Sequence, residues 1–312
     1  MPRSISRREF LRIVGVGAAG LAVPRRAPAR DDAPAAARRK PNIIRNFIDD
    51  LGWRDVSFMG SKFYETPNID RLASGGMVFT RAYANAPNCA PTRACLMSGQ
   101  YTPRNGVYTV GSSERGQSRF RKLIPIKNNT ILDAKVVTIA EALKPAGYIT
   151  ASMGKWHLGD GETGPVGQGF DVNVGGNTAG NPRGYFSPYR NKDLPDGPKG
   201  EYLTDRLTDE ALKFIEASRD RPFFLYLTHY AVHTPIQAKK DLIAKYKGKK
   251  PDGGQNNAAY AAMIESTDQG VGRIMDKLDE LKLADDTVVV FFSDNGGYGG
   301  VTSMAPLRGA KG

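Results

Sequence analysis

The chain has 312 residues, of which 40% are hydrophobic and 24% charged, so its composition is that of a globular protein with room for a sizeable core. Its formal net charge of +12 at pH 7 would suit a nucleic-acid-binding protein, but the first 40 residues hold ten basic and three acidic side chains. Residues 41–312 therefore carry only +5, which suits an anionic substrate without demanding one. We expect no nucleic-acid partner.

The amino terminus has the order of an export signal. The pair Arg7-Arg8 precedes an apolar run at residues 13–23 that is rich in Gly and Ala. Paired arginines are typical of the twin-arginine route, and about a dozen apolar residues are too few for a permanent membrane span. The alternative is a basic disordered tail with a chance hydrophobic patch.

A low-complexity linker over residues 24–40 separates this signal from the folded part of the chain. We therefore predict a signal peptide and linker over residues 1–40 and a catalytic domain over residues 41–312. The predicted partner is the twin-arginine export machinery, and the predicted location is the bacterial periplasm or the outside of the cell.

From residue 41 onward, expected strands and helices alternate. Strands are expected at residues 41–48, 78–84, 148–153, 222–227 and 287–292, and helices at residues 68–74, 91–98, 138–144, 207–217 and within 258–283. The strand runs are continuously apolar, and helices separate most of them. This indicates an α/β fold with a mostly parallel or mixed central sheet and helices on both faces. A long Gly-, Pro- and Asn-rich surface excursion fills residues 160–200.

Polar side chains follow four of the expected strands. They are Asp49 and Asp50, Lys155 and His157, His229 and His233, and Asp294 and Asn295. Ligands of parallel sheets bind beyond the carboxyl ends of the strands, so these groups are expected on one rim. The two acidic motifs offer only oxygen donors, which calcium and magnesium prefer, and adjacent carboxylates repel unless a cation offsets them. Separate turns and caps are the alternative, because Asp-Asn-Gly is a common turn signal.

The two cysteines, Cys89 and Cys95, are not expected to form a disulfide. On one helix their Cα atoms would lie about 9 Å apart, beyond the reach of the bond. Cys89 stands just before a helix that starts with Pro91, where backbone N–H groups and the helix dipole favour an anion, and Arg93 would face the same end. A buried structural cysteine is the alternative. A Cys-x5-Arg phosphatase loop fails, because Cys95 occupies the arginine position.

The segment from Cys89 to Gly99, CAPTRACLMSG, closely resembles the signature of the formylglycine-dependent sulfatases. Further motifs match in the family's order, namely DDLGW at 49–53, TPNID at 66–70, GKWHLG at 154–159, HTP at 233–235, DNG at 294–296 and RGAK at 308–311. The resemblance implies an alkaline-phosphatase-like fold, hydrolysis of sulfate esters, and a sulfated carbohydrate or aryl sulfate as substrate.

The resemblance also implies a modified nucleophile and a metal. A formylglycine-generating enzyme would oxidise Cys89 to formylglycine, whose hydrate has one hydroxyl to attack sulfur and a second to drive the elimination of sulfate. One calcium ion would polarise the sulfate. Its implied ligands are Asp49, Asp50, Asp294, Asn295 and the modified Cys89.

The remaining roles follow from the same motifs. Arg93 matches the arginine that supports the formylglycine, and His157 matches the histidine that contacts its hydrate. Lys155 and Lys311 match the lysines that hold the sulfate, where fixed positive charge stabilises the transition state. His233 matches the histidine that protonates the leaving oxygen.

Some positions depart from the family pattern. Arg45 and Asn46 interrupt the first expected strand, where burial without partners would be costly. His229 and His233 are four residues apart but lie beyond a strand, so we do not expect a zinc pair. We expect His229 to be structural or to lie at the rim of the substrate site, and Cys95 to be reduced and unmodified.

Family members usually continue well beyond the position of Gly312. The chain is therefore expected to be an incomplete catalytic domain that lacks the C-terminal subdomain, folds poorly alone and has little activity. Two alternatives stay open: a phosphate or phosphonate ester hydrolase of the same superfamily, and an inactive anion-binding remnant. Comparing the hydrolysis of an aryl sulfate with that of the matching phosphate would distinguish a sulfatase from the first alternative. Detecting either aldehyde or thiol at Cys89 would distinguish an enzyme from the second.

Overall fold

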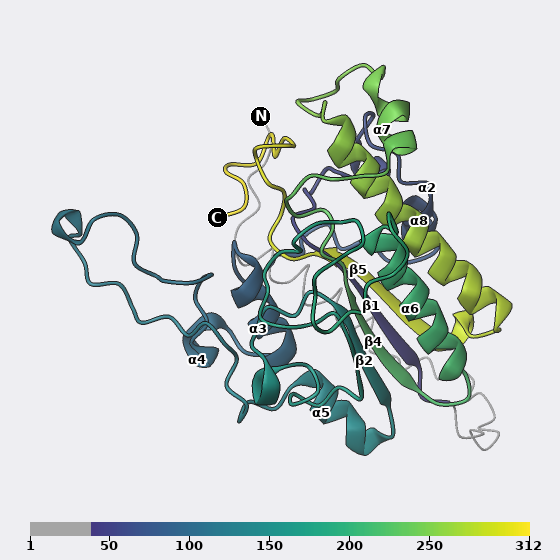
Figure 1. The fold of residues 1–312 in the computed structure, drawn as a ribbon, viewed down its shortest axis with the longest axis horizontal. Coiled ribbons are helices and arrows are strands. Elements are labelled where there is room, and N and C mark those ends of the chain that lie inside the picture. The colour runs from purple at the N-terminus through teal and green to yellow at the C-terminus, as the bar shows by residue number, and fades with distance from the viewer. Residues whose placement is uncertain (1–38) are drawn as a thin grey trace, which may run out of the picture. The chain divides into compact units, whose positions relative to one another are not determined.

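A five-stranded sheet organises the chain (Figure 1), whose computed structural model describes residues 39–312. Its strands are β1 (Asn42–Ile48), β2 (Ile149–Gly154), β3 (Val172–Val174), β4 (Phe223–Thr228) and β5 (Thr287–Ser293). Their order is β3-β2-β4-β1-β5, and each neighbouring pair is parallel. The predicted sheet is thus confirmed. The predicted signal peptide lies outside the described residues.

Burial explains the continuous apolar runs. Every residue of β4 is buried, because β4 lies between β1 and β2 and helices cover both of its faces. Phe223, Leu225 and Leu227 belong to one core cluster, whereas Phe224 and Tyr226 belong to the other. The alternation of side chains along a strand therefore divides the core into two layers.

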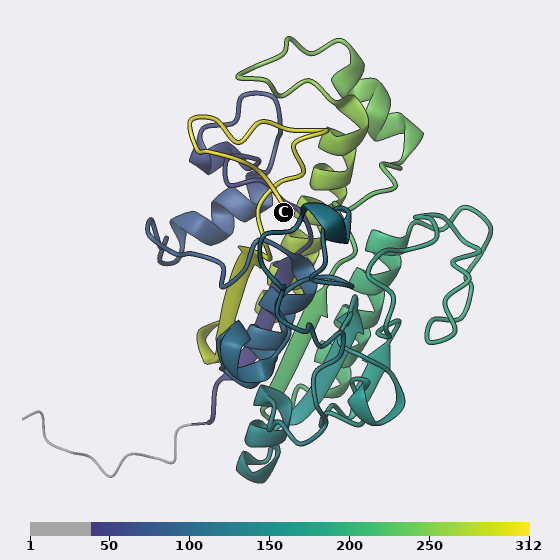
Figure 2. The same ribbon diagram turned by 90° about the vertical axis from the view of Figure 1, so that its left-hand side faces the viewer.

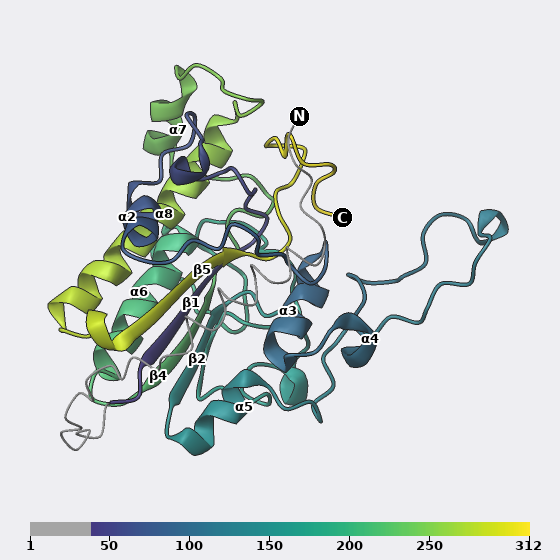
Figure 3. The same cartoon turned by 180° about the vertical axis from the view of Figure 1, so that it is seen from behind.

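Helices cover both faces of the sheet, as predicted (Figures 1 and 3). One core layer contains residues of α2 (Pro67–Ser74), α6 (Leu203–Ala217), α7 (Lys240–Lys247) and α8 (Ala258–Glu280), and the other those of α3 (Cys89–Ser98) and α5 (Ile139–Leu143). The four-residue α4 (Thr102–Asn105) follows α3. Short 3-10 turns occupy Ser57–Met59, Ser118–Phe120, Lys144–Ala146, Gly161–Thr163 and Ala284–Asp286. Among residues 39–312, no helix is both long and apolar enough to cross a bilayer.

Some expected elements need correction. The strand predicted at residues 78–84 is wrong: this segment has no strand partner, and Phe79 and Tyr83 are 74% and 87% exposed. Apolar and β-branched residues favour a strand only where a neighbouring strand is available. The helix predicted at residues 91–98 begins at Cys89, since a proline is tolerated within a first helical turn. The elements β3 and α7 were not predicted.

The two polar residues that interrupt β1 are only partly accommodated. The guanidinium of Arg45 lies over the ring of Phe292, at 5.9 Å from its centroid, but its Nη1 is buried without a hydrogen-bond partner among the described residues. Asn46 is almost fully buried, and its Oδ1 finds no hydrogen-bond partner among residues 39–312. Burying these polar groups in β1 therefore still lowers the free energy of unfolding, because some of their atoms lack hydrogen-bond partners.

Candidate active site

The loops that carry the predicted site residues meet at the carboxyl end of the sheet (Figure 2). Asp49 follows β1, Lys155 follows β2, His233 lies beyond β4 and Asp294 follows β5. Backbone hydrogen bonds join these loops: Val232 N–H donates to the Asp49 carbonyl (2.6 Å), and Asp294 N–H donates to that of Ile48 (3.1 Å). The rim predicted from the strand ends is therefore present.

Three carboxylates crowd together at this rim. One carboxylate oxygen from each of Asp49, Asp50 and Asp294 lies within 4.8 Å of the others, and all three residues are buried. Two carboxylate oxygens of this group (Asp49 Oδ1 and Asp294 Oδ2) and the neighbouring amide oxygen Asn295 Oδ1 have no hydrogen-bond partner in the described part of the chain. Like charges this close repel, and unpartnered buried oxygens are costly. The residues present therefore fit a hard divalent cation, which takes oxygen ligands.

Two buried cationic side chains reach the same carboxylates. Lys155 Nζ donates to Asp49 Oδ2, and Arg93 Nη2 lies 3.7 Å from this oxygen and 3.5 Å from Asp294 Oδ2. Arg93 Nη1 donates to the Lys155 carbonyl (2.7 Å) and to Thr228 Oγ1. Although burial acts to raise it, the pKa of Asp49 is held well below its usual value by Lys155 and Arg93. The pKa of Asp294 is raised by burial and by the charge of Asp49.

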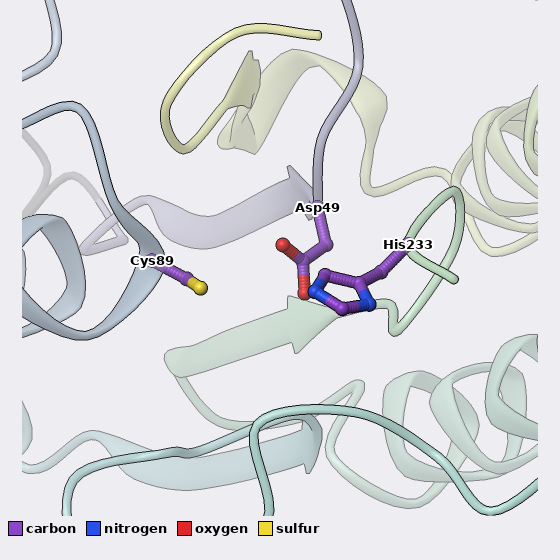
Figure 4. Close-up of side chains that lie close together, drawn as sticks. All are labelled: Asp49, Cys89 and His233. Atoms are coloured by element: carbon purple, nitrogen blue, oxygen red, sulfur yellow. The ribbon is translucent and has the colours of Figure 1, made fainter. Parts of the chain in front are cut away.

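Cys89 is the first residue of α3, with Asn88 as its N-cap. Its Sγ lies within 4.8 Å of ligand atoms of Asp49 and His233, and Figure 4 shows the three side chains converging from separate elements. Burial raises the pKa of the Cys89 thiol, so the thiol is not activated as a thiolate. Both cysteines are free, which confirms the expected absence of a disulfide.

An open pocket of about 350 Å³ lies beside the carboxylates. Its walls are Asp50, Asn88, His233, Thr234, Tyr298, Lys311 and Gly312. Lys311 Nζ is 2.8 Å and His233 Nε2 is 3.6 Å from Asp50 Oδ2, and Asn295 Nδ2 donates to Asp50 Oδ1 (2.9 Å). Asp50 thus joins the carboxylate cluster to the pocket. Burial lowers the pKa of His233, against the charge of Asp49.

His157 is held firmly next to this cluster. Its backbone N–H donates to the Asn177 carbonyl (2.9 Å), and a Cβ on Gly180 would lie only 2.5 Å from its imidazole ring. Burial, with Lys155 and Arg93, lowers the pKa of His157 to about 3, so its ring is neutral near pH 7. Its φ of 63° and that of 61° at Asp50 lie in the left-handed region, where non-glycine residues store strain that clusters at functional sites.

The ten predicted site residues thus gather at one rim, whereas their individual roles stay predictions. His229 does not line the pocket; it is fully buried, and burial lowers its pKa to about 4. The sequence assigned no role to the pocket-wall residues Asn88, Thr234 and Tyr298. Thr234 lies inside the HTP motif, and Asn88 and Tyr298 lie within two residues of the motifs at 89–99 and 294–296, which was the one signal available.

Comparisons with known proteins agree on one family. The family model described as "Sulfatase" matches residues 41–312. A "Sulfatase" of Formosa agariphila is 37% identical over 88% of this chain, and human N-acetylgalactosamine-6-sulfatase is 34% identical over 84%. The crystal structure of Ps i-CgsB in complex with k-i-k-neocarrahexaose is 33% identical, with a TM-score of 0.73 over 88% of this chain. The chain spans 61%, 51% and 63% of these three relatives.

Proposed function

We propose, from the premise that this chain belongs to the sulfatase family, that it hydrolyses sulfate esters at the rim around Cys89. The observation that carries the proposal is that Cys89, in the first turn of a helix, lies beside Asp49, which also belongs to the cluster of three buried carboxylates. We favour sulfated carbohydrate as the substrate class. One relative is named for a sulfated amino sugar, and another was solved with k-i-k-neocarrahexaose.

In this proposal, a formylglycine-generating enzyme oxidises Cys89 to formylglycine. The hydrated aldehyde supplies two hydroxyl groups on one carbon, one to attack sulfur and one to drive the elimination of sulfate. The unmodified thiol is a poor substitute, because burial raises its pKa and it has no second hydroxyl. Export by the twin-arginine route would carry the protein already folded, so the oxidation would precede export.

Asp49, Asp50, Asp294 and Asn295 would hold one calcium ion, together with the modified Cys89. The support is their all-oxygen donor set and its unpartnered atoms. When bound, the cation polarises the sulfate group.

The side chains of the rim would then divide the remaining work. Arg93 and Lys155 are fully buried and keep Asp49 ionised, which favours its role as a ligand. Lys311 stands in the pocket wall, where its ammonium group can bind a sulfate oxygen and stabilise developing negative charge. His233, in the same wall, would give its proton to the leaving alcohol oxygen. Burial lowers the pKa of His233, and the negative charges of Asp49 and Asp50, the latter 3.6 Å from Nε2, act against this lowering.

We also propose export to the periplasm or beyond the cell through the signal at residues 1–40. The test fuses these residues to a reporter protein that is exported only when folded. A reporter that reaches the periplasm, but stays in the cytoplasm after Arg7→Lys and Arg8→Lys, supports the proposal. Export that ignores both substitutions contradicts the twin-arginine route.

The catalytic proposal is tested by co-producing the chain with a formylglycine-generating enzyme. Mass spectrometry of the peptide that contains Cys89 should show aldehyde in place of thiol. An aryl sulfate should be hydrolysed faster than the matching aryl phosphate, and Cys89→Ala should abolish the reaction. Preference for the phosphate would favour the phosphoesterase alternative, and an intact thiol without hydrolysis would favour an anion-binding remnant.

A further inference from the structure

A second pocket, of about 320 Å³, opens in the excursion that follows β2. Its walls include three basic residues and no acidic one: Arg183, Arg190 and Lys192. Lys192 is paired with Asp160, but within residues 39–312 neither arginine forms an ion pair with a carboxylate. The pocket therefore presents two exposed arginine side chains that are not ion-paired within the described residues.

The backbone around these arginines is held in place. Asn177 Nδ2 donates to Asn191 Oδ1 (2.9 Å) and Asp193 Oδ2 (2.8 Å), which closes the loop on itself. Arg190 has a φ of 53°, in the left-handed region that disfavours residues with a Cβ atom. Asp196 supports this conformation, since its Oδ1 accepts the Arg190 N–H (3.3 Å). A strained residue held by its neighbours is more typical of a binding site than of a passive loop.

The same excursion contacts the catalytic rim at two points. The Asn177 carbonyl accepts the His157 N–H, and Gly180 lies against the His157 ring. Tyr185 OH lies 2.7 Å from the Tyr230 carbonyl and 2.8 Å from that of His233. The arginine pocket is therefore built into the scaffold that positions both catalytic histidines.

The two pockets lie close to each other along the chain. Tyr230 lines the arginine pocket, and His233 lines the catalytic pocket. Three residues of chain span at most about 11 Å, so these two wall residues lie within that distance of each other. An oligosaccharide with anionic groups on neighbouring sugars is therefore long enough to reach from one pocket into the other.

We propose that Arg183 and Arg190 form a subsite for a second anionic group, a sulfate or a carboxylate, on a sulfated oligosaccharide whose other sulfate enters the catalytic pocket. This inference rests on the proposed function, because it deepens the substrate class to polyanionic saccharides. Guanidinium groups suit this role, since their planar donors pair with sulfate or carboxylate oxygens in a bidentate manner.

Binding is measured with the full chain carrying Cys89→Ala, labelled and applied to an array of saccharides that bear one or several sulfate groups. The parent should bind doubly sulfated saccharides about tenfold or more tightly than their singly sulfated counterparts. Arg183→Gln with Arg190→Asn should bring this ratio close to one, and asparagine keeps the left-handed backbone accessible. Lys199→Gln, on the same excursion but outside the pocket, is the matched control and should keep the ratio.

A ratio that the double substitution leaves unchanged would overturn the subsite, as would failure of the parent to bind any sulfated saccharide. Circular-dichroism melts of all three proteins exclude a folding defect, and Arg183→Gln and Arg190→Asn measured singly should each lower the ratio in part. The proposed function is judged separately. If the chain hydrolyses an aryl sulfate but shows no preference for polyanionic saccharides, only the subsite proposal is wrong. If it shows an arginine-dependent preference but no hydrolysis, only the catalytic proposal is wrong.

Discussion

Replacing Arg93 by methionine should be among the most damaging changes in the chain. The guanidinium is fully buried, 3.7 Å from Asp49 Oδ2 and 3.5 Å from Asp294 Oδ2, and lies 4.8 Å from the centroid of the Phe47 ring. Methionine keeps much of the apolar length but leaves the carboxylates with less counter-charge. Removing one partner of a buried ion pair costs about 3–5 kcal/mol. The midpoint of thermal unfolding should fall by roughly 6–20 °C.

The measurement is urea unfolding followed by circular dichroism at several calcium concentrations. A cation at 100 times its dissociation constant stabilises the folded state by about 2.7 kcal/mol, so calcium should recover part of the loss in Arg93→Met. Arg273→Met is the matched control. It breaks an ion pair with Asp209 whose side chains are 44% and 40% exposed, so it should cost at most about 1 kcal/mol. If Arg93→Met costs no more than this control, Arg93 is not the counter-charge of the carboxylate cluster.

The remaining predictions concern the same rim. The pKa of Asp294 is raised in the folded state without divalent cations. Above the ordinary aspartate pKa of 3.8, the folded state therefore binds more protons than the unfolded chain. The free energy of unfolding should fall as the pH rises through that window. Asp294→Asn should flatten this slope in EGTA while abolishing stabilisation by calcium; urea midpoints that keep the slope would contradict it. Gly180→Ala, whose Cβ would lie 2.5 Å from the His157 ring, should cost about 1–3 kcal/mol and lower kcat. Gly248→Ala, at a glycine with a φ of -95° and no neighbour within 4 Å of its Cβ, should leave kcat unchanged.

Much of this architecture could be read from apolar runs and motifs because both report local constraints. A strand buried on both faces must be apolar throughout, so the run around Phe223–Thr228 identified β4. The three-residue β3 (Val172–Val174) is too short to produce such a run. The segment at residues 78–84 has strand-forming residues but no strand to pair with, which no local pattern reveals.

For the candidate site, the sequence likewise indicated which residues would take part but not how they pair. Strand ends and motifs indicated which residues would meet, since parallel strands bring their carboxyl ends to one edge. They did not indicate that Lys155 faces Asp49 while Lys311 faces Asp50, because these pairings depend on how separate loops pack. The arginine pocket was likewise unforeseen. Its residues belong to no recognised motif, and they come together only through the hydrogen bonds of the excursion.

The charges of the rim suggest how the proposed cation and substrate depend on each other. With Asp294 ionised, as a cation ligand must be, three carboxylates (Asp49, Asp50 and Asp294) face three cationic side chains (Arg93, Lys155 and Lys311), so their formal charges cancel while the Cys89 thiol is neutral. A divalent cation would leave an excess of two positive charges in a buried setting, and an anionic sulfate group would reduce that excess. Each should therefore bind more tightly in the presence of the other, by the same factor in both directions. Inorganic sulfate titrated with and without calcium measures this coupling directly, and equal affinities would mean that the two sites are electrostatically independent.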